Sequence, residues 1–147
     1  MFSFASMDRY ELAWAAGFFD GEGWAASARF GRGEQRRPQA RVNQAGTDGV
    51  PEVLTRFRAA LQAGRLGGPY RKTGRRDMYC WEAASRNDVE LIHHLLAPWL
   101  GQVKLLQFAT ALARASLHAR EARPDDEWRS WAAGLYDGEG CSALLRH

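Results

Sequence analysis

The sequence is poor in cysteine and has no long apolar run. Its two cysteines, Cys80 and Cys141, are too few and too far apart for a disulfide framework or a zinc knuckle, so we interpret them as reduced thiols. No apolar run approaches the roughly 20 residues that span a bilayer, and the start lacks a basic region followed by an apolar stretch. These absences predict a cytoplasmic chain without a membrane partner.

Lysine is also scarce. Lys72 and Lys104 are the only lysines, so 18 of the 20 basic residues are arginine, and the net charge is +3. A GC-rich gene gives the same bias, but arginine also offers a planar fork that fits phosphate and the edge of guanine. Two stretches that read as strands and turns hold ten of the basic residues: Arg29, Arg32, Arg36, Arg37 and Arg41, then Arg65, Arg71, Lys72, Arg75 and Arg76.

The 147 residues, 46% hydrophobic and 25% charged, have the size and composition of one globular domain. Hydrophobic periodicity predicts its elements in this order: a helix over 10–20, strands over 24–30 and 39–44, a helix ending before Gly64, strands over 68–73 and 77–83, a helix ended by Pro98, a helix over 102–122, and a second copy of the first helix. We therefore predict an α+β fold, with helices on one face of an antiparallel sheet.

Such a sheet leaves one face open. The alternation within the strands predicts polar and basic side chains on that face, and an antiparallel ribbon is narrow enough to enter the major groove of double-stranded DNA. A solvated surface is the alternative for any single residue, but the set over two hairpins favours nucleic-acid binding. The candidate DNA-binding residues are Ser27, Arg29, Arg32, Arg36, Arg37, Arg41, Asn43, Arg71, Thr73, Arg75 and Arg76.

One phrase occurs twice in the chain. WAAGFFDGEG begins at Trp14, and WAAGLYDGEG begins 117 residues later at Trp131. That offset is far too long for a solenoid period and is close to the length of one compact module. Each copy carries a narrow stripe of small residues at helical spacing, so we predict that the two helices pack closely. The predicted interface residues are Ala13, Ala16, Gly17 and Asp20 in the first copy and Ser130, Ala133, Gly134 and Asp137 in the second.

The opposite sides of these helices carry Trp14 and Phe18, or Trp131 and Leu135, which we expect to lie beneath a sheet.

Close packing would bring together the residues that follow each helix. These are Glu22 and Glu139, each between glycines in GEG. Two carboxylates that meet at a two-fold axis can hold a divalent cation such as Mg²⁺, with backbone carbonyls of Gly21 and Gly138 as further oxygen ligands. A metal there could activate water for phosphodiester hydrolysis.

The repeated phrase resembles the LAGLIDADG motif of homing endonucleases, over residues 15–23 and 132–140. The resemblance implies an αββαββα module, Glu22 and Glu139 as ligands of the catalytic metal, and Asp20 or Asp137 as structural partners between the helices. By the same resemblance, Gln44 would order water near the active site and Lys104 would be its basic residue, although a lysine extended along a helix surface is nearly as good an interpretation. A further basic residue of the family's pattern has no counterpart, because Asp48 stands near its place.

The repeat divides the chain into three parts. We predict a complete module over 1–122, a linker over 123–127, and the start of a second, truncated module over 128–147, with its motif helix and a first-strand stub. The first functional hypothesis is a site-specific DNA endonuclease, or half of one, of the kind that mobile introns or inteins encode. The alternative is a maturase-like remnant that binds DNA or intron RNA without cutting. If the two motif helices pair within one chain, the protein is a monomer. If the complete modules of two chains pair, it is a homodimer.

Overall fold

The computed structural model describes residues 7–144 apart from 30, 34 and 115–123, with side chains described as far as 138. The order of elements is the predicted one. The elements are α1 (Arg9–Glu22), β1 (Gly23–Arg29), β2 (Arg36–Gly46), α2 (Glu52–Leu61), β3 (Arg65–Tyr70), β4 (Asp77–Ala83), α3 (Arg86–Leu96), α4 (Gln102–Ala111) and α5 (Asp125–Leu144). In the part of the chain that the structure describes, no helix is both long and apolar enough to cross a membrane.

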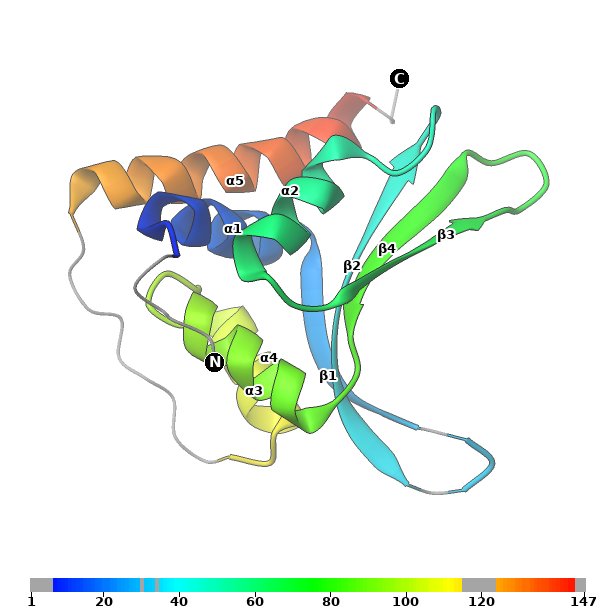
Figure 1. The fold of residues 1–147 in the computed structure, drawn as a ribbon, viewed down its shortest axis with the longest axis horizontal. Helices are drawn as coiled ribbons and strands as arrows, with labels where there is room; N and C mark the ends of the chain where they lie inside the picture. Colours follow the sequence, from blue (N-terminus) through cyan, green and yellow to red (C-terminus); the bar gives the residue numbers. More distant parts are fainter. Residues whose placement is uncertain (1–6, 30, 34, 115–123, 145–147) are drawn as a thin grey trace.

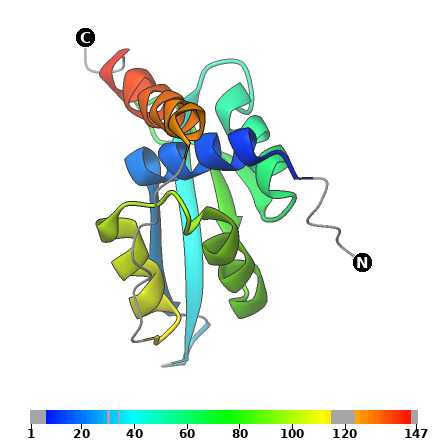
Figure 2. The same ribbon diagram turned by 90° about the vertical axis from the view of Figure 1, so that its left-hand side faces the viewer.

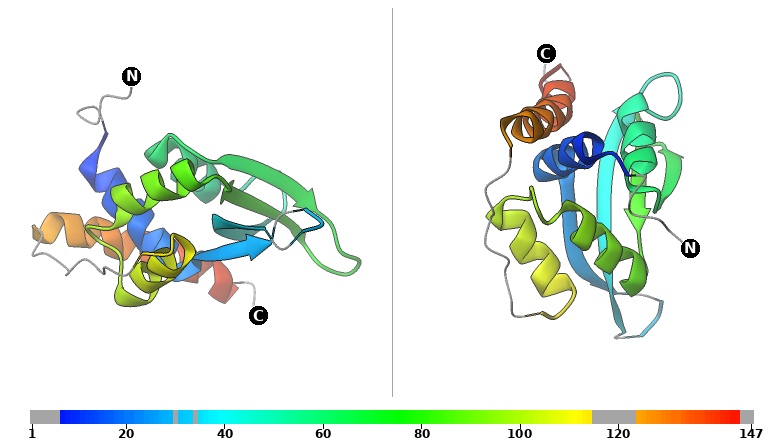
Figure 3. Two further views of the ribbon diagram at one scale, coloured as in Figure 1. Left: turned by 90° about the horizontal axis from the view of Figure 1, so that it is seen from below. Right: turned by 60° about the vertical axis from the view of Figure 1, so that its left-hand side comes forward.

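The four strands form one antiparallel sheet in the order β1-β2-β4-β3. All the helices lie on one side of it, so the other face is open, as predicted (Figure 1; Figure 3, right). In the central strand β2, Ala40 and Val42 are buried beneath the helices, whereas Arg41 and Asn43 lie on the open face. This alternation is the predicted one, because residues 39–43 of β2 switch at every position between polar and apolar side chains.

The core lies between the covered face of the sheet and the helices. Aromatic rings from several elements meet there: Phe57 of α2 packs edge-on against Trp81 of β4, with 4.8 Å between ring centroids. Phe18 and Phe19 of α1 also contact Phe57, at 5.4 Å and 6.4 Å. All four side chains are fully buried, so α1 is fixed at the centre of the module.

The faces of β1 are reversed relative to the prediction. Ser27 pairs with Pro38, which is buried beneath the helices, so Ser27 and its neighbour of the same face, Arg29, lie on the covered side. The open side of β1 carries Ala26 and Ala28 instead. In this stretch alanine alternates with serine and arginine. Alanine and serine differ too little in hydrophobicity to determine which set of side chains faces the helices. The pairing with β2 determines it.

The strand β3 differs from the prediction at both ends. It begins at Arg65 rather than 68, and it ends at Tyr70. The pairing with β4 shifts register between Gly67 and Tyr70, and the last pair of the ladder is Tyr70 with Met78. Arg71 and Thr73 are consequently in the turn and not on the open face of a strand.

The C-terminal elements also differ from the prediction. The helix expected over 102–122 ends at Ala111, and residues 115–123 lie outside the described part. The predicted linker over 123–127 overlaps the first turn of α5, which begins at Asp125. Three acidic residues, Asp125, Asp126 and Glu127, make that turn favourable, because carboxylates stabilise a helix N-terminus.

The predicted strand stub over 141–147 is helical in its described part, since α5 continues to Leu144. A strand requires a neighbouring strand for its hydrogen bonds, whereas a helix makes them within itself. In the described part of the chain, no strand lies beside these residues, and the helix is the conformation that satisfies their backbone groups.

Candidate active site and nucleic-acid interface

The helices α1 and α5 lie side by side and run in the same direction (Figures 1 and 2). They approach most closely at two glycines. A Cβ atom added to Gly17 would lie 1.8 Å from the carbonyl oxygen of Trp131, and one added to Gly134 would lie 1.9 Å from that of Trp14. No larger residue fits at either position without separating the helices, as the prediction of close packing at these glycines requires.

Two matched hydrogen bonds flank this contact. Trp14 Nε1 donates to Asp137 Oδ2 at 2.9 Å, and Trp131 Nε1 donates to Asp20 Oδ2 at 2.8 Å. The donor on each helix thus meets the acceptor on the other at the equivalent position of the repeat. This reciprocity is the mark of an approximate two-fold relation between the helices.

The contacting stripe differs from the predicted one in its alanines. Ala133 is exposed, whereas Ala13 and Ala16 are fully buried. The tryptophans, which were expected beneath the sheet, instead reach across to the partner helix. The pattern of small residues does not predict these contacts, because it takes account of side-chain size alone. An indole N–H is also a hydrogen-bond donor, and here it pairs with a carboxylate of the partner helix.

The carboxylate of Asp20 has a second function in the fold. Both of its oxygens accept the backbone N–H of Gly101, at 3.0 Å each. Gly101 is the N-cap residue of α4, so a negative charge lies where the backbone N–H groups of α4 are unpaired. Asp20 therefore connects three helices: α1, α4 and, through Trp131, α5.

The end of α1 lies against α5. A Cβ atom on Gly138 would be 2.7 Å from Cγ of Glu22, so the backbone of α5 passes directly beside the Glu22 side chain. The side chain of the predicted partner, Glu139, lies outside the described atoms, although its backbone belongs to α5. Among the described residues, no three histidine, cysteine or acidic side chains gather as a metal site.

Lys104 of α4 reaches the same place. Its ammonium donates to the carbonyl oxygen of Gly23, the residue after Glu22. Burial lowers the pKa of the Lys104 ammonium, and the negative charges of Asp20 and Glu22 partly offset this shift. The structure thus brings a cation to the predicted catalytic carboxylate, although 81 residues separate Lys104 from Gly23.

Gln44 lies on the covered face of β2, two residues beyond Val42, which pairs with Gly23. This position is next to the junction of α1 and β1. The side chain is only 5% exposed, and among the described residues it has no hydrogen-bond partner. A buried carboxamide without a partner is costly unless water or a ligand supplies one.

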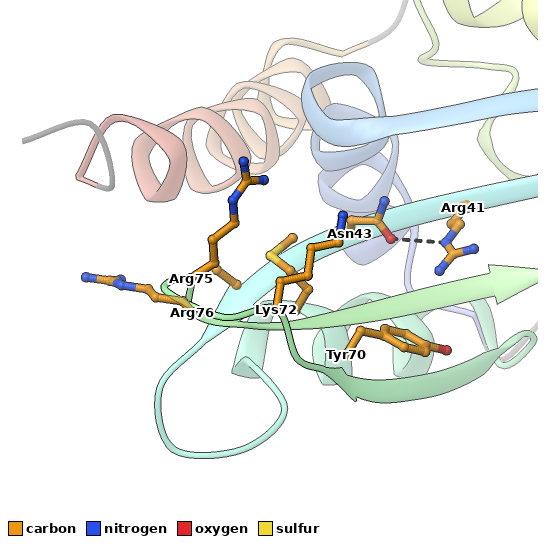
Figure 4. Close-up of a pocket in the computed structure, with 8 residues that line it drawn as sticks. Arg41, Asn43, Tyr70, Lys72, Arg75 and Arg76 are labelled. Carbon is orange, nitrogen blue, oxygen red and sulfur yellow. Dashed lines mark hydrogen bonds between the residues drawn. The ribbon is translucent and has the colours of Figure 1, made fainter.

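The open face of the sheet carries a basic groove of about 560 Å³ (Figure 4). Arg41 and Asn43 come from β2, Tyr70 from the end of β3, and Lys72, Arg75 and Arg76 from the turn that leads into β4; Ala45 and Met78 complete the lining. Of the predicted DNA-binding residues, the groove gathers Arg41, Asn43, Arg75 and Arg76.

Three groove cations have no acidic partner within 4.0 Å in the described part of the chain: Lys72, Arg75 and Arg76. Arg41 donates to Asn43 Oδ1 at 3.0 Å and lies 3.7 Å from Glu82. A hydrogen bond from Arg65 lowers the pKa of Glu82, so this carboxyl stays charged. Negative ligands would therefore be attracted chiefly to the turn end of the groove.

The other predicted DNA-binding residues lie elsewhere. Arg71 is paired with Asp77 at 3.6 Å, and Thr73 is exposed in the turn outside the groove lining. Arg32 is exposed between β1 and β2, and Arg36 and Arg37 are exposed at the start of β2. Sequence reasoning missed Lys72, Tyr70 and Met78 as groove residues, because the register shift in β3 has no pattern of its own in the sequence.

No protein-family model and no curated protein matches this sequence. Solved structures match its fold. They include the homing endonuclease I-CvuI in complex with its target, with a TM-score of 0.58 at 21% identity over 71% of this chain and 65% of that one. The LAGLIDADG homing endonuclease I-GzeII in complex with its DNA target gives a TM-score of 0.57 at 12% identity over 90% of this chain and 59% of that one.

The LAGLIDADG meganuclease I-CpaMI bound to uncleaved DNA gives a TM-score of 0.54 at 16% identity, over 90% of this chain and 61% of that one. The fold is that of the LAGLIDADG homing endonucleases. The helices α1 and α5 carry the two copies of the repeated phrase. The chain spans less than two thirds of the length of these three structures.

Proposed function

We propose that this chain is a metal-dependent DNA endonuclease of the homing type, or one half of such an enzyme. The observation that carries the proposal is the convergence at the end of α1, where Lys104 contacts Gly23 beside Glu22 and the buried, unpartnered Gln44 lies next to the same junction. A carboxylate can hold a divalent metal, a cation can offset charge on the phosphate, and a buried amide can orient water, and each of these contributions serves phosphodiester hydrolysis.

The groove supplies the binding surface for double-stranded DNA. Lys72, Arg75 and Arg76 would contact phosphates, whereas Arg41 and Asn43 lie deeper on the strands, where side chains can read base edges. Asn43 and Gln44 are successive residues of β2 and face opposite sides of the sheet. DNA held in the groove is therefore close to the strand that also carries the candidate site.

A divalent cation such as Mg²⁺ would be held by Glu22 and Glu139, with backbone oxygens of Gly21 and Gly138. The oxygen donors at this position and the unpartnered Gln44 fit a hydrated hard cation. When bound, the metal supplies Lewis-acid stabilisation of the charge on phosphate. The chain's own contributions are the ammonium of Lys104, which offsets negative charge, and the carboxamide of Gln44, which orients water.

The test begins with a pool of randomised DNA duplexes, because the recognised sequence is not fixed by the groove residues alone. Duplexes that the chain retains are selected in EDTA and then incubated with Mg²⁺. We expect cleavage of the selected duplexes with Mg²⁺, none in EDTA, and none with Glu22→Gln, which removes a charge but keeps the shape. The Glu22→Gln protein should still bind the same duplexes. Equal cleavage by this variant would refute the proposed site.

The second candidate function is a protein that binds DNA or structured RNA without cutting it. The described part of the chain contains a single four-stranded sheet with one basic groove, and this arrangement favours binding alone. In the same experiment, such a protein would enrich a duplex that stays intact in Mg²⁺. A pool of folded RNAs is selected in parallel, and tighter retention of one of these RNAs than of every duplex would favour a maturase-like function.

A further inference from the structure

We propose that Arg41 and Asn43 form a unit that presents only hydrogen-bond donors to DNA, and that this unit selects guanine at one position of the bound sequence. Glu82 is the positioning residue that holds Arg41 in place. The inference rests on the proposed binding of double-stranded DNA in the groove, and it adds a base that the groove recognises.

The unit begins with a hydrogen bond on the open face of β2. Arg41 Nε donates to Asn43 Oδ1 at 3.0 Å (Figure 4). A guanidinium has donors only, so the oxygen of the carboxamide faces it and the amino group of Asn43 is directed elsewhere. Nη2 of Arg41 shares one edge of the guanidinium with Nε and therefore lies on the side of Asn43. Among the described residues, neither Nη2 nor this amino group has a hydrogen-bond partner, so two neighbouring donors remain for a ligand.

Further contacts hold the Arg41 guanidinium in this position. Glu82 pairs with Arg41 across the strands, and its Oε2 lies 3.7 Å from Nη1. The guanidinium also lies over the ring of Tyr70, with Cζ 5.9 Å from the ring centroid. Glu82 is itself fixed by hydrogen bonds from Arg65, at 2.7 Å, and from Gln39, at 3.0 Å. The donor arrangement therefore exists before DNA binds, and binding need not order these side chains.

Two neighbouring donors match one base better than the others. In the major groove, guanine presents two acceptors side by side, N7 and O6, whereas adenine presents one acceptor and the N6 amino donor. An unrestrained asparagine reads adenine by accepting from N6 and donating to N7. Here the oxygen that would accept from N6 already binds the positive guanidinium of Arg41, so two donors would compete for it. The unit consequently favours guanine over adenine.

Thymine is the strongest competitor of guanine. It presents the O4 acceptor and a methyl group, and the apolar side chains of Ala45 and Met78 line the same groove and can contact that methyl. With a single acceptor, however, thymine leaves one of the two donors unpaired, and a desolvated donor without a partner is unfavourable. Cytosine presents only the N4 amino donor. We therefore expect guanine to be preferred first and thymine second.

Selection from a pool of randomised duplexes in EDTA tests the inference through binding alone, independently of cleavage. We expect the wild-type consensus to contain a guanine that becomes adenine in Arg41→Ala, because Asn43 regains a free oxygen. Two duplexes that differ only at this base pair should show the reversal, with a preference of roughly tenfold in each direction. The control is Arg75→Ala, which should weaken binding of both duplexes and leave the preference for guanine unchanged.

Asn43→Asp gives a second, independent change of preference. One carboxylate oxygen keeps the bond from Arg41 and the other becomes a free acceptor, so we expect cytosine, whose N4 amino group is a donor, at the same position. Glu82→Gln tests the positioning residue, since the loss of its charge releases Arg41 and should reduce the preference for guanine over adenine. Its matched control is Glu90→Gln in α3, which removes a carboxylate paired with Arg114 at 2.9 Å and should leave the preference unchanged.

The hydrogen bond within the unit can also be measured without DNA. In NMR spectra of the free protein, the Nε–H proton of Arg41 should exchange slowly with water, and Asn43→Ala should remove this protection. Equal exchange rates in the two proteins contradict the donor unit, whatever the selection gives.

The outcomes of the selection separate this inference from the proposed function. If the wild-type protein retains duplexes but either Arg41→Ala or Asn43→Asp keeps its base preference at every position, the groove binds DNA without this donor unit, and the inference alone is overturned. If the wild-type protein retains no duplex, the proposed function fails and the inference fails with it.

Discussion

Asp20 and Asp137 occupy equivalent positions of the repeat but have different surroundings. Each accepts a hydrogen bond from a tryptophan of the other helix. Asp20 also binds the backbone N–H of Gly101, whereas Asp137 has Arg56 at 3.7 Å and a side chain 38% exposed. The same residue type therefore has a structural role in one copy and a weaker one in the other.

We expect Asp20→Asn to lower the free energy of unfolding by about 1.5 to 3 kcal/mol, the range for hydrogen bonds to charged groups. Asp137→Asn, the matched control, should cost less than about 1 kcal/mol, because an exposed ion pair contributes little. Urea unfolding followed by circular dichroism measures both. Equal losses would show that the contact between Asp20 and Gly101 does not stabilise α4.

The pKa of Lys104 depends on the carboxylates that lie near it. Burial lowers this pKa, and the charges of Asp20 and Glu22 raise it. Glu22→Gln removes one of the raising charges, so the pKa of Lys104 should fall further, which NMR titration of the lysine side chain measures. The control is Glu52→Gln in α2, whose carboxyl is not among the groups that shift Lys104. An unchanged pKa in Glu22→Gln would place Lys104 away from the candidate site.

The lowered pKa of Lys104 makes the stability of the folded protein depend on pH in a defined direction. A lysine with a depressed pKa in the folded protein binds its proton less tightly there than in the unfolded chain. Its contribution to stability therefore improves as pH rises from the lowered folded-state value towards the ordinary value of 10.5.

At the scale of the elements, α4 closes the edge of the sheet. Gln107 Oε1 accepts the backbone N–H of Ala25 in the edge strand β1, at 3.0 Å. An open edge of this kind can pair with another chain, so the contact protects the strand as well as anchoring the helix.

Gln107→Ala should destabilise the protein by about 1 kcal/mol and promote association at high concentration, because a backbone donor of the edge strand loses its acceptor. Gln102→Ala is the control, since Gln102 is exposed on the same helix. Thermal unfolding and light scattering measure the two effects. If both variants behave alike, α4 protects the edge by packing and not by this hydrogen bond.

The order of the elements and the faces of β2 could be predicted, because strong contrasts between apolar and polar residues mark them. The faces of β1 could not, since Ala26, Ser27 and Ala28 differ little in hydrophobicity. The glycine positions of the α1 and α5 contact followed from the small-residue spacing. The tryptophan-to-aspartate bonds depend on the direction of two indole rings, which spacing does not specify.

At the scale of the whole molecule, the long-range contacts of the candidate site are the hardest feature to predict from the sequence. The proximity of Lys104 to Gly23 was expected only from the family resemblance, because helix periodicity does not place one element against another. The position of Gln44 on the covered face follows from β2 alternation, but its missing partner is a property of the folded chain.

The whole charge distribution determines how DNA binding responds to salt. Each phosphate contact lowers the slope of log K against log salt by roughly 0.9. We expect Arg75→Ala to make this negative slope shallower by about 1 and to weaken binding of a selected duplex. Arg29→Ala, at an arginine that is also exposed but lies on the covered side of β1, should change the slope less. A slope that responds more to Arg29 than to Arg75 would place the DNA outside the groove.

The aromatic residues around α5 make its attachment optically visible. Four of the six tryptophans belong to or touch this helix or its partner surface: Trp14, Trp99, Trp128 and Trp131. Trp14 is 1% exposed and lies beneath the guanidinium of Arg56, 3.9 Å from the ring centroid. Since indole emission shifts to longer wavelength when water reaches the ring, release of α5 should redden the intrinsic fluorescence. The unlabelled chain thus contains its own spectroscopic reporter of whether the helix is bound.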